Sequence, residues 1–247
     1  MSNKKVHFYN ENFFKYINKG SKNASEIIIP IITNHFEVKS VLDVGCGSGI
    51  WLESWRDSGI ADVSGIDGCE VDSIKASHIS QLDLCNRFDL ERSFSIVQCL
   101  EVAEHIPEEY SSSLISSICK HSEVIIFSAA PPGQGGEHHV NEQCFEYWRR
   151  HFNHYGYSPY DLIRDKIINI RSIPPWYRYN MLVYIKDNSF YSNKFSEDKI
   201  NKKDSIIDLS PLTYKIRKKI ISFLPVRIST FIARVKKSLT LLIERIR

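Results

Sequence analysis

The sequence predicts an α/β domain built on a doubly wound, mostly parallel sheet. The first observation is the stretch 41–49, VLDVGCGSG, in which a short apolar run leads directly into a glycine-rich turn. The second is that comparable apolar runs return at 61–67, 94–100 and 123–128, separated by enough chain for helical crossovers. With 247 residues and 43% hydrophobic content, the chain is long enough for one such domain with additions.

The turn carries glycines at alternate positions. Gly45, Gly47 and Gly49 lack a Cβ atom, so they reach backbone angles closed to other residues and let a ligand approach the main chain. The helix expected at 50–58, which stops before Gly59, offers free N–H groups at its start. A dinucleotide-binding turn has glycines at the first, third and sixth places, whereas here they occupy the first, third and fifth. The spacing therefore argues against NAD or FAD.

Together with Asp43, these glycines match the pattern Glu/Asp-x-Gly-x-Gly-x-Gly. This resembles the first motif of class I S-adenosylmethionine (SAM) methyltransferases. The resemblance implies a Rossmann-like sheet of seven strands, SAM as the cofactor, and contact of Asp43, Gly45, Gly47 and Gly49 with its methionine end. An ordinary glycine-rich strand-to-helix turn is the alternative.

Two further acids follow strands where the cofactor would lie. Asp67 ends the strand expected at 61–67, 18 residues beyond Gly49, where a carboxylate can accept hydrogen bonds from both ribose hydroxyls. Asp83, in the short strand and turn at 81–84, matches by resemblance the family position that contacts the adenine amino group. Either acid can instead be a simple turn former.

The string LEVAEHIP at 100–107 follows the strand predicted at 94–100 and resembles the branch of the family that methylates small molecules. Residues just past this strand tip, beginning with Glu101, would lie beside the methyl sulfonium of SAM. His105 suits a proton acceptor, since the unperturbed pKa of histidine is about 6.5. A histidine packed against the cofactor, with its nitrogens bonded to the backbone, is the alternative. The Asn-Pro-Pro type motif of the larger rRNA and DNA amino-methylating groups does not occur at this position.

Residues 128–143 are predicted to form a loop, because proline and glycine exclude regular structure there. The loop would close over a substrate beside the cofactor. His138 or His139, helped by Glu142, is the candidate base that removes a proton from an acceptor hydroxyl. We expect no metal, because adjacent histidines on a loop point apart; ligation by His, His, Glu and Asn is the rival interpretation. In a third interpretation, the polar side chains of the loop only cap its own turns.

This loop and the aromatic pairs after it resemble a bacterial subgroup of SAM methyltransferases with a PGQGG…HxNEQ…YW…WY…N pattern, often met in surface-polysaccharide gene clusters. The resemblance covers 8–186 and departs at Pro132 and at 178–179. Its candidates for substrate binding are Gln134, Asn141, Gln143, Trp148, Tyr177 and Asn180. Core packing is the competing role of Trp148, which falls on an apolar stripe of the helix expected at 143–155.

The two ends of this region are expected to complete the fold. Residues 1–26, polar with interspersed aromatics, and the apolar stretch 27–32 would form a helical cap over the cofactor. Residues 160–168 and 181–185 would be the last two strands, an antiparallel hairpin in the family fold, with 173–180 as their connection.

Charge divides the chain into an acidic body and a basic tail. The overall net charge is +3, yet 211–247 hold ten Lys or Arg against one acid. We therefore predict a methyltransferase domain at 1–187, a polar linker at 188–209 and a basic amphipathic helical tail at 210–247. Two tail helices, broken at Pro225, would contact an anionic membrane, a partner protein or the body itself. Nucleic acid is disfavoured, because aromatic and basic residues do not interleave there.

Composition favours a cytoplasmic protein, peripheral at the inner face of the membrane if the tail binds lipid. The six cysteines are scattered without a CxxC pair, which fits a reducing cytosol. The N-terminus lacks the apolar core of a signal peptide, and no stretch approaches the ~20 apolar residues of a membrane span.

Together these features predict SAM-dependent methyl transfer to a hydroxyl of a sugar or another polar small molecule in surface-polysaccharide biosynthesis. The acceptor would be free or a lipid-linked glycan. N-methylation of an amino sugar is the alternative within the enzymes. A non-catalytic SAM-binding scaffold at the membrane and a nucleic-acid methyltransferase that uses the basic tail are the remaining interpretations.

Overall fold

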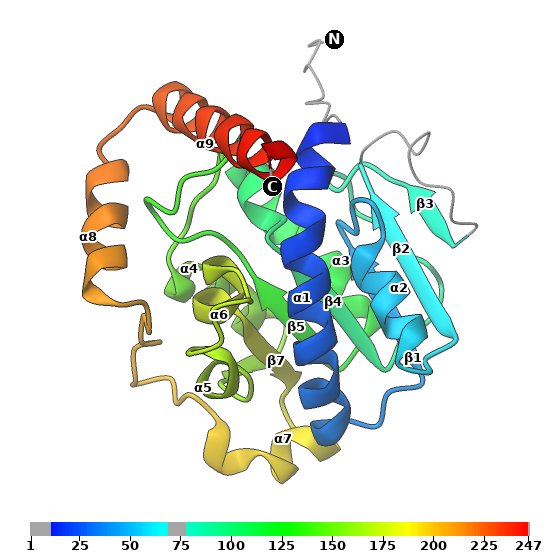
Figure 1. The fold of residues 1–247 in the computed structure, drawn as a ribbon. Helices are drawn as coiled ribbons and strands as arrows, with labels where there is room; N and C mark the ends of the chain where they lie inside the picture. Colours follow the sequence, from blue (N-terminus) through cyan, green and yellow to red (C-terminus); the bar gives the residue numbers. More distant parts are fainter. Residues whose placement is uncertain (1–10, 69–77, 247) are drawn as a thin grey trace, which may run out of the picture.

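The computed structural model describes residues 11–68 and 78–246, which form one seven-stranded sheet covered by helices on both faces (Figure 1). The strand order is β3-β2-β1-β4-β5-β7-β6. The strands are β1 (Ser40–Val44), β2 (Asp62–Asp67), β3 (Ile79–Gln81), β4 (Ile96–Leu100), β5 (Val124–Ser128), β6 (Tyr157–Tyr160) and β7 (Leu182–Lys186). The doubly wound class I methyltransferase fold predicted from the sequence is confirmed.

Strands β1 to β5 are parallel, and β7 inserts antiparallel between β5 and β6. Every residue of β1, β4 and β5 is buried, as expected for central strands of a parallel sheet with both faces covered. Because the chain order reverses between β1 and β4, the carboxyl ends of these strands open onto a crevice where ligands bind in such sheets.

Alternate residues of each strand feed two separate cores. Val41 and Ile96 face one core with α1 and α2, whereas Leu42 and Val97 face the other with α3 and α4. Figure 1 shows α1 running across the first face of the sheet. The α-helices of the described residues are α1 (Glu11–His35), α2 (Ile50–Asp57), α3 (Ser111–His121), α4 (Phe145–His154), α5 (Arg164–Ile167), α6 (Pro175–Asn180), α7 (Phe190–Lys194), α8 (Leu212–Ile221) and α9 (Val226–Ile246), and short 3-10 turns lie at η2 (Ala103–His105), η3 (Glu108–Tyr110) and η4 (Ser196–Asp198).

The N-terminal cap and the last hairpin differ from expectation in their limits. Helix α1 supplies the predicted cap, while the part of that prediction before residue 11 lies outside the described residues. The strand predicted at 160–168 is wrong, because β6 ends at Tyr160 and α5 follows. Arg164 is buried there and bound to the Asp161 carboxylate three residues earlier, a contact that a turn allows and an extended strand does not.

The segment 188–209, expected as a polar linker, lies against the body. The Ile200 amide donates to the carbonyl of Pro159 in β6 (3.0 Å). Arg149 in α4 donates to the Ile200 and Asp204 carbonyls, and Ile206 is buried. The segment therefore runs as a bound strap along the sheet edge. It leads into α8 and α9, the two helices predicted for the tail, and α9 crosses to the start of α1 (Figure 1).

Candidate active site

A cavity of about 1300 Å³ opens at the carboxyl ends of β1, β2 and β4. Its lining comes from the glycine turn, the turn after β4 and residues 134–140 of the loop after β5. Further walls come from the end of β2, from residues 81–86 at the end of β3 and after it, and from helices α1, α2, α6, α8 and α9. Of the residues predicted as sites, the lining includes Asp43, Gly45, Gly47, Asp67, Asp83, Glu101, His105, Gln134, His138, His139 and Tyr177.

The glycine turn needs its glycines for conformation and for space. Gly45, Gly47 and Gly49 have φ angles of 79°, 53° and 83°, which other residues rarely adopt. A Cβ atom on Gly45 would lie 2.3 Å from Cγ2 of Val102, so the close approach of β1 to the turn after β4 leaves no room for one. Gly49 caps α2 and does not line the cavity.

Two carboxylates lie beside this turn: that of Asp43 is buried, and that of Asp67 is hydrogen-bonded to the turn. Asp43 is 3% exposed, and burial raises its pKa from 3.8 to about 7. Oδ2 of Asp67 accepts a hydrogen bond from the Gly47 amide (2.7 Å), which joins the tip of β2 to the turn. These groups fit SAM. The glycine turn leaves space beside the backbone that a Cβ atom would fill, and the two carboxylates can accept hydrogen bonds from the ammonium group and the ribose hydroxyls of the cofactor.

Asp83 also borders the cavity, but its carboxylate closes its own turn. Oδ1 accepts from the Cys85 amide (2.9 Å) and Oδ2 from the Asn86 side chain (3.0 Å). Both oxygens are thus engaged in the local turn geometry that the alternative interpretation described. Contact with adenine stays a prediction.

Glu101 forms a closed triangle with two residues predicted to bind substrate. Its carboxylate accepts from Nε2 of Gln134 (2.7 Å) and from Nδ2 of Asn180 (3.2 Å), and Asn180 also donates to Oε1 of Gln134 (2.8 Å). Burial raises the pKa of Glu101, and its backbone has a φ of 57°, a strained conformation typical of functional sites. Asn180 holds the other two in place from behind the cavity wall.

A second group of titratable residues lies next to this triangle. One ligand-capable atom of each of Glu104, His105 and His139 lies within 4.8 Å of the other two. The imidazole rings of His105 and His139 meet edge to face, with centroids 4.9 Å apart. The histidines were predicted from the sequence, whereas Glu104 was not, although it lies within the LEVAEHIP string.

Glu142 organises the loop and does not line the cavity. Its carboxylate accepts hydrogen bonds from the amides of Gly133 and Gly135, both at 2.7 Å, and from Nδ1 of His139 at 2.8 Å. Glu142 therefore positions His139. Its predicted catalytic role would need direct contact with the substrate, which a residue outside the cavity lining does not make. His138, the residue before His139, lines the cavity, and its backbone φ is 64°.

Besides Asn180, three more of the predicted substrate residues lie away from the cavity. Asn141 is buried. Its side-chain Nδ2 donates to Ser111 Oγ (3.0 Å), and its backbone N–H donates to the Glu104 carbonyl. Gln143 donates to Asn141 Oδ1 (3.0 Å). Trp148 is 2% exposed and packs on Phe127 in the core between the sheet and α4. These three are corrections: they hold the loop and the core, because burial and hydrogen bonding already occupy them.

Tyr177 reaches the cavity from α6 and ties three helices together. Its hydroxyl is 3.1 Å from Ser21 Oγ in α1 and 3.4 Å from Trp51 Nε1 in α2, which donates to it. The cavity wall at this point therefore depends on α1, α2 and α6 together.

The tail covers the mouth of the cavity, an arrangement that the sequence left open. Arg217 in α8 donates to the Gln134 carbonyl (2.9 Å), and Glu137 pairs with Arg234 (2.9 Å) and Lys237 (2.7 Å) of α9. Lys236 also lines the cavity. Among the described helices, none combines the length and the apolar character needed to cross a membrane.

The chain resembles known proteins at the level of family and fold. A family model described as "Methyltransferase domain" matches residues 14–172. The chain is 35% identical over 82 residues to the ubiquinone biosynthesis O-methyltransferase of Idiomarina loihiensis, covering 28% of this chain and 33% of that protein. The corresponding protein of Neisseria meningitidis serogroup C is 38% identical over 84 residues, with 28% and 34% covered. The alignments thus span about a third of these relatives.

Two solved structures share the fold. DesVI of Streptomyces venezuelae is 16% identical, with a TM-score of 0.54 over 73% of this chain and 100% of that one. The sugar N-methyltransferase KedS8 of a Streptoalloteichus species is 15% identical, with a TM-score of 0.53 over 75% and 98%. At such identities the likeness concerns architecture.

Proposed function

The chain belongs to the methyltransferase-domain family and is a SAM-dependent methyltransferase, and from that premise we propose that its acceptor is a hydroxyl of a sugar or similar polar small molecule. The observation that carries this proposal is the second half of the cavity. There Glu101 and Gln134, held from behind by Asn180, lie beside the cluster of Glu104 and two histidines. A polyhydroxylated ligand finds both donors and acceptors on such a wall.

Oxygen methylation requires that a proton leave the acceptor. SAM supplies a methyl group on a sulfonium, so that the new O–C bond forms as the C–S bond breaks and its electron pair returns to sulfur. The chain has to hold the hydroxyl oxygen about 3 to 3.5 Å from that carbon and to assist loss of its proton. The cluster of Glu104, His105 and His139 is where the described residues provide groups for that task.

Comparison with named relatives supports the chemistry in different ways. Ubiquinone biosynthesis O-methyltransferases are oxygen methylating by name, and KedS8 is a sugar N-methyltransferase by name. We retain N-methylation of an amino sugar as the second candidate, because an amine lone pair lessens the need for a base.

We test the acceptor by incubating the full chain and SAM with nucleotide-linked sugars, lipid-linked sugars and amino sugars, and by measuring S-adenosylhomocysteine release and the methylated atom by NMR. A methyl ether is the expected product. A methylamine product, retained when His138 and His139 are both replaced by Gln, would establish the nitrogen alternative. Binding of SAM without transfer to any class would favour the non-catalytic scaffold.

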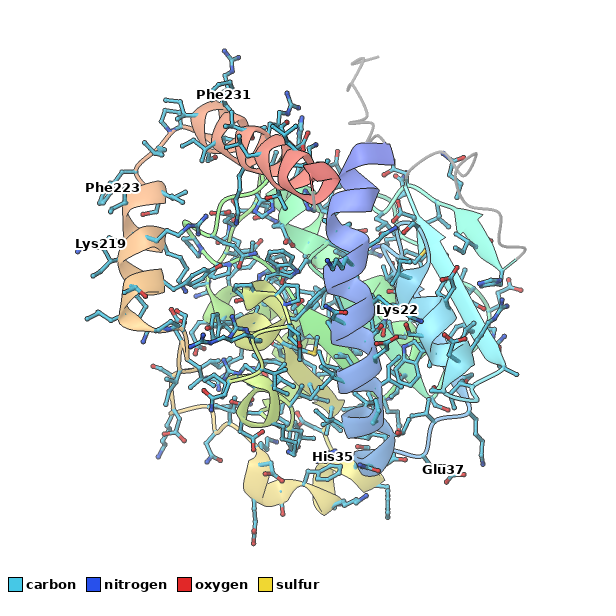
Figure 2. The ribbon with its side chains drawn as sticks, viewed as in Figure 1. Lys22, His35, Glu37, Lys219, Phe223 and Phe231 are labelled. Carbon is cyan, nitrogen blue, oxygen red and sulfur yellow. The ribbon has the colours of Figure 1, made fainter. Side chains whose placement is uncertain are left out.

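The tail adds a proposal about where the acceptor resides. Ile221 and Ile232 line the cavity, but many other apolar side chains of the tail are exposed to solvent. They are Leu212, Ile216, Ile220, Phe223, Val226, Ile228, Phe231, Val235, Leu239 and Leu242. Figure 2 shows Lys219, Phe223 and Phe231 at the outer edge of the molecule. An apolar face with basic neighbours suits the surface of an anionic membrane, and such a surface would present a lipid-linked acceptor to the cavity mouth.

Sedimentation with vesicles tests this placement. The chain should bind phosphatidylglycerol vesicles and release from them as salt rises, with little binding to phosphatidylcholine vesicles. Replacing both Phe223 and Phe231 by Ser should weaken binding about tenfold or more, because each buried aromatic side chain contributes about 1.5–3 kcal/mol. Phe190→Ser is the matched control, since Phe190 is 73% exposed on α7, outside the tail. Equal loss in the control would refute a tail-specific surface.

A further inference from the structure

Glu104 is the most unusual carboxylate among the described residues of the cavity. It is fully buried, and neither carboxylate oxygen accepts a well-formed hydrogen bond from the described residues, although the backbone amides of Glu104 and Ala130 approach the group. A buried polar group whose hydrogen bonds are incomplete destabilises the fold, so its persistence at a cavity wall calls for a ligand.

The two histidines beside Glu104 are oriented for ligation. Nδ1 of His105 lies 3.2 Å from the His138 carbonyl, and Nδ1 of His139 lies 2.8 Å from Glu142 Oε1. An oxygen acceptor at Nδ1 places the proton there and leaves Nε2 unprotonated, the form that binds metal ions. A carboxylate behind a ligating imidazole is also the usual support in metal sites.

The backbone of Gly136 packs against the His139 imidazole. A Cβ atom at position 136 would lie 2.0 Å from His139 Nε2, so this position of the ring requires glycine there. The ligand-capable atoms of the three residues lie within 4.8 Å of one another. Ligands about 2.1 Å from a common ion are at most ~4.2 Å apart, so small side-chain rotations close the site.

We propose that Glu104, His105 and His139 bind one divalent transition-metal cation, for which Mn²⁺ and Zn²⁺ are the first probes. Two imidazoles and one carboxylate form a ligand set common for such ions, and three protein ligands leave a position open toward the cavity. The sequence prediction of no metal considered His138, His139, Asn141 and Glu142, which the fold does not bring together as ligands. The fold brings in Glu104 and His105 from the turn after β4 instead.

The consequence for the reaction rests on the proposed function. An acceptor hydroxyl at the open position would have its pKa lowered by the cation and would release its proton to water, while the C–S bond breaks and the O–C bond forms. The two imidazoles then serve as ligands and not as the proton acceptor. Cation binding itself does not depend on which acceptor is used.

Calorimetric titration of the untagged, chelator-treated full chain with MnCl₂ and with ZnCl₂ tests the site, with S-adenosylhomocysteine present. We expect one cation per chain for at least one of the two. Glu104→Gln and His139→Gln should each weaken its affinity about 100-fold or more, because each removes a ligand. His138→Asn is the matched control: its side chain is outside the cluster, and Asn tolerates the positive φ of 64° at that position.

Separate measurements distinguish misfolding of a variant from loss of the cation site. Retained S-adenosylhomocysteine affinity in Glu104→Gln shows that this variant is folded, and His139→Gln provides a second chance if it is not. No binding of either cation to the wild-type chain, or equal affinity in the ligand variants, overturns the site. Full activity of a metal-free chain would overturn the catalytic role, whereas cation binding without transfer to any acceptor would count against the proposed function alone.

Discussion

The two halves of the cavity are built differently. The half that fits SAM comes from the tips of β1 and β2 and the glycine turn, and its main contacts join positions 43–67. The acceptor half combines the turn after β4, the loop after β5, α6 and the two tail helices. Its central hydrogen bond, from Asn180 to Glu101, spans 79 positions, and the Arg217 contact spans 83.

This difference separates what the fold requires from what is specific to this chain. Backbone conformation and strand-end carboxylates define the cofactor half, so its chemistry follows from the sheet itself. Side chains from distant segments define the acceptor half, so its specificity depends on how the loop and the tail are held. Substitutions in the first half should abolish cofactor binding, and those in the second should change the acceptor while SAM still binds.

The largest effect is expected at Gly45. Gly45→Ala places a methyl group against Val102 in a backbone conformation that alanine disfavours, at a cost of about 2–5 kcal/mol. Thermal unfolding should shift down by ten degrees or more, with S-adenosylhomocysteine binding lost. Gly59→Ala is the control, because Gly59 has a φ of 97° and its added methyl group would have no neighbour within 4 Å. Comparable damage in both variants would mean that strain alone, and not the crowded turn, matters.

Asp67 should show the next largest effect. Asp67→Ala removes the acceptor for the Gly47 amide and the carboxylate expected for ribose, so affinity for SAM should fall about 30- to 100-fold by calorimetry. Asp83→Ala is the companion, and a change of only a few-fold is expected because its oxygens already close a local turn. A larger loss in Asp83→Ala would restore that residue to the adenine site.

Asp43 should make the stability of the folded protein depend on pH. The unfolded chain releases this proton near pH 3.8, whereas the folded protein keeps it up to a pKa of about 7. The folded state therefore binds more protons between these values, and stability of the cofactor-free protein falls as pH rises through that window. Asp43→Asn should flatten the fall in unfolding temperature between pH 5 and 7.5 by a few degrees. Asp57→Asn, at an exposed acid on α2, should leave the slope as it is, and parallel slopes in all three proteins would contradict the assignment.

The smallest effect is expected where the tail meets the loop. Glu137→Gln weakens the pairs with Arg234 and Lys237, which are worth about 1 kcal/mol in this partly exposed setting. Limited proteolysis should cut α9 several times faster, with SAM affinity unaltered. The exposed Glu37–Lys39 pair supplies the control through Glu37→Gln. Unchanged cleavage in Glu137→Gln would mean that other contacts hold the tail.

Asp43, Gly45, Gly47 and Asp67 could be predicted at the cavity from the sequence, because glycine spacing and strand-end acids are local signals, and their contact with SAM stays a prediction. The strand at 160–168 failed because the burial of Arg164 depends on Asp161 and on a carbonyl of the strap. Glu104 was missed because the incomplete hydrogen bonding of a buried carboxylate is invisible without the fold. The tail was ambiguous for a related reason: Arg217, Lys236 and Lys237 line the cavity while many apolar side chains of the same helices are exposed, which is the reverse of ordinary burial.

The strap that precedes the tail has a kinetic consequence. The Ile207 carbonyl is held by Arg164 and Lys218 binds Asp208 at 2.6 Å, so only a few residues separate the fixed strap from the start of α8. Tail helices that detach on so short a tether stay near the cavity mouth at an effective concentration on the order of millimolar. Reclosure is then a unimolecular event, independent of protein concentration, and a free peptide copy of 210–247 should compete with it poorly.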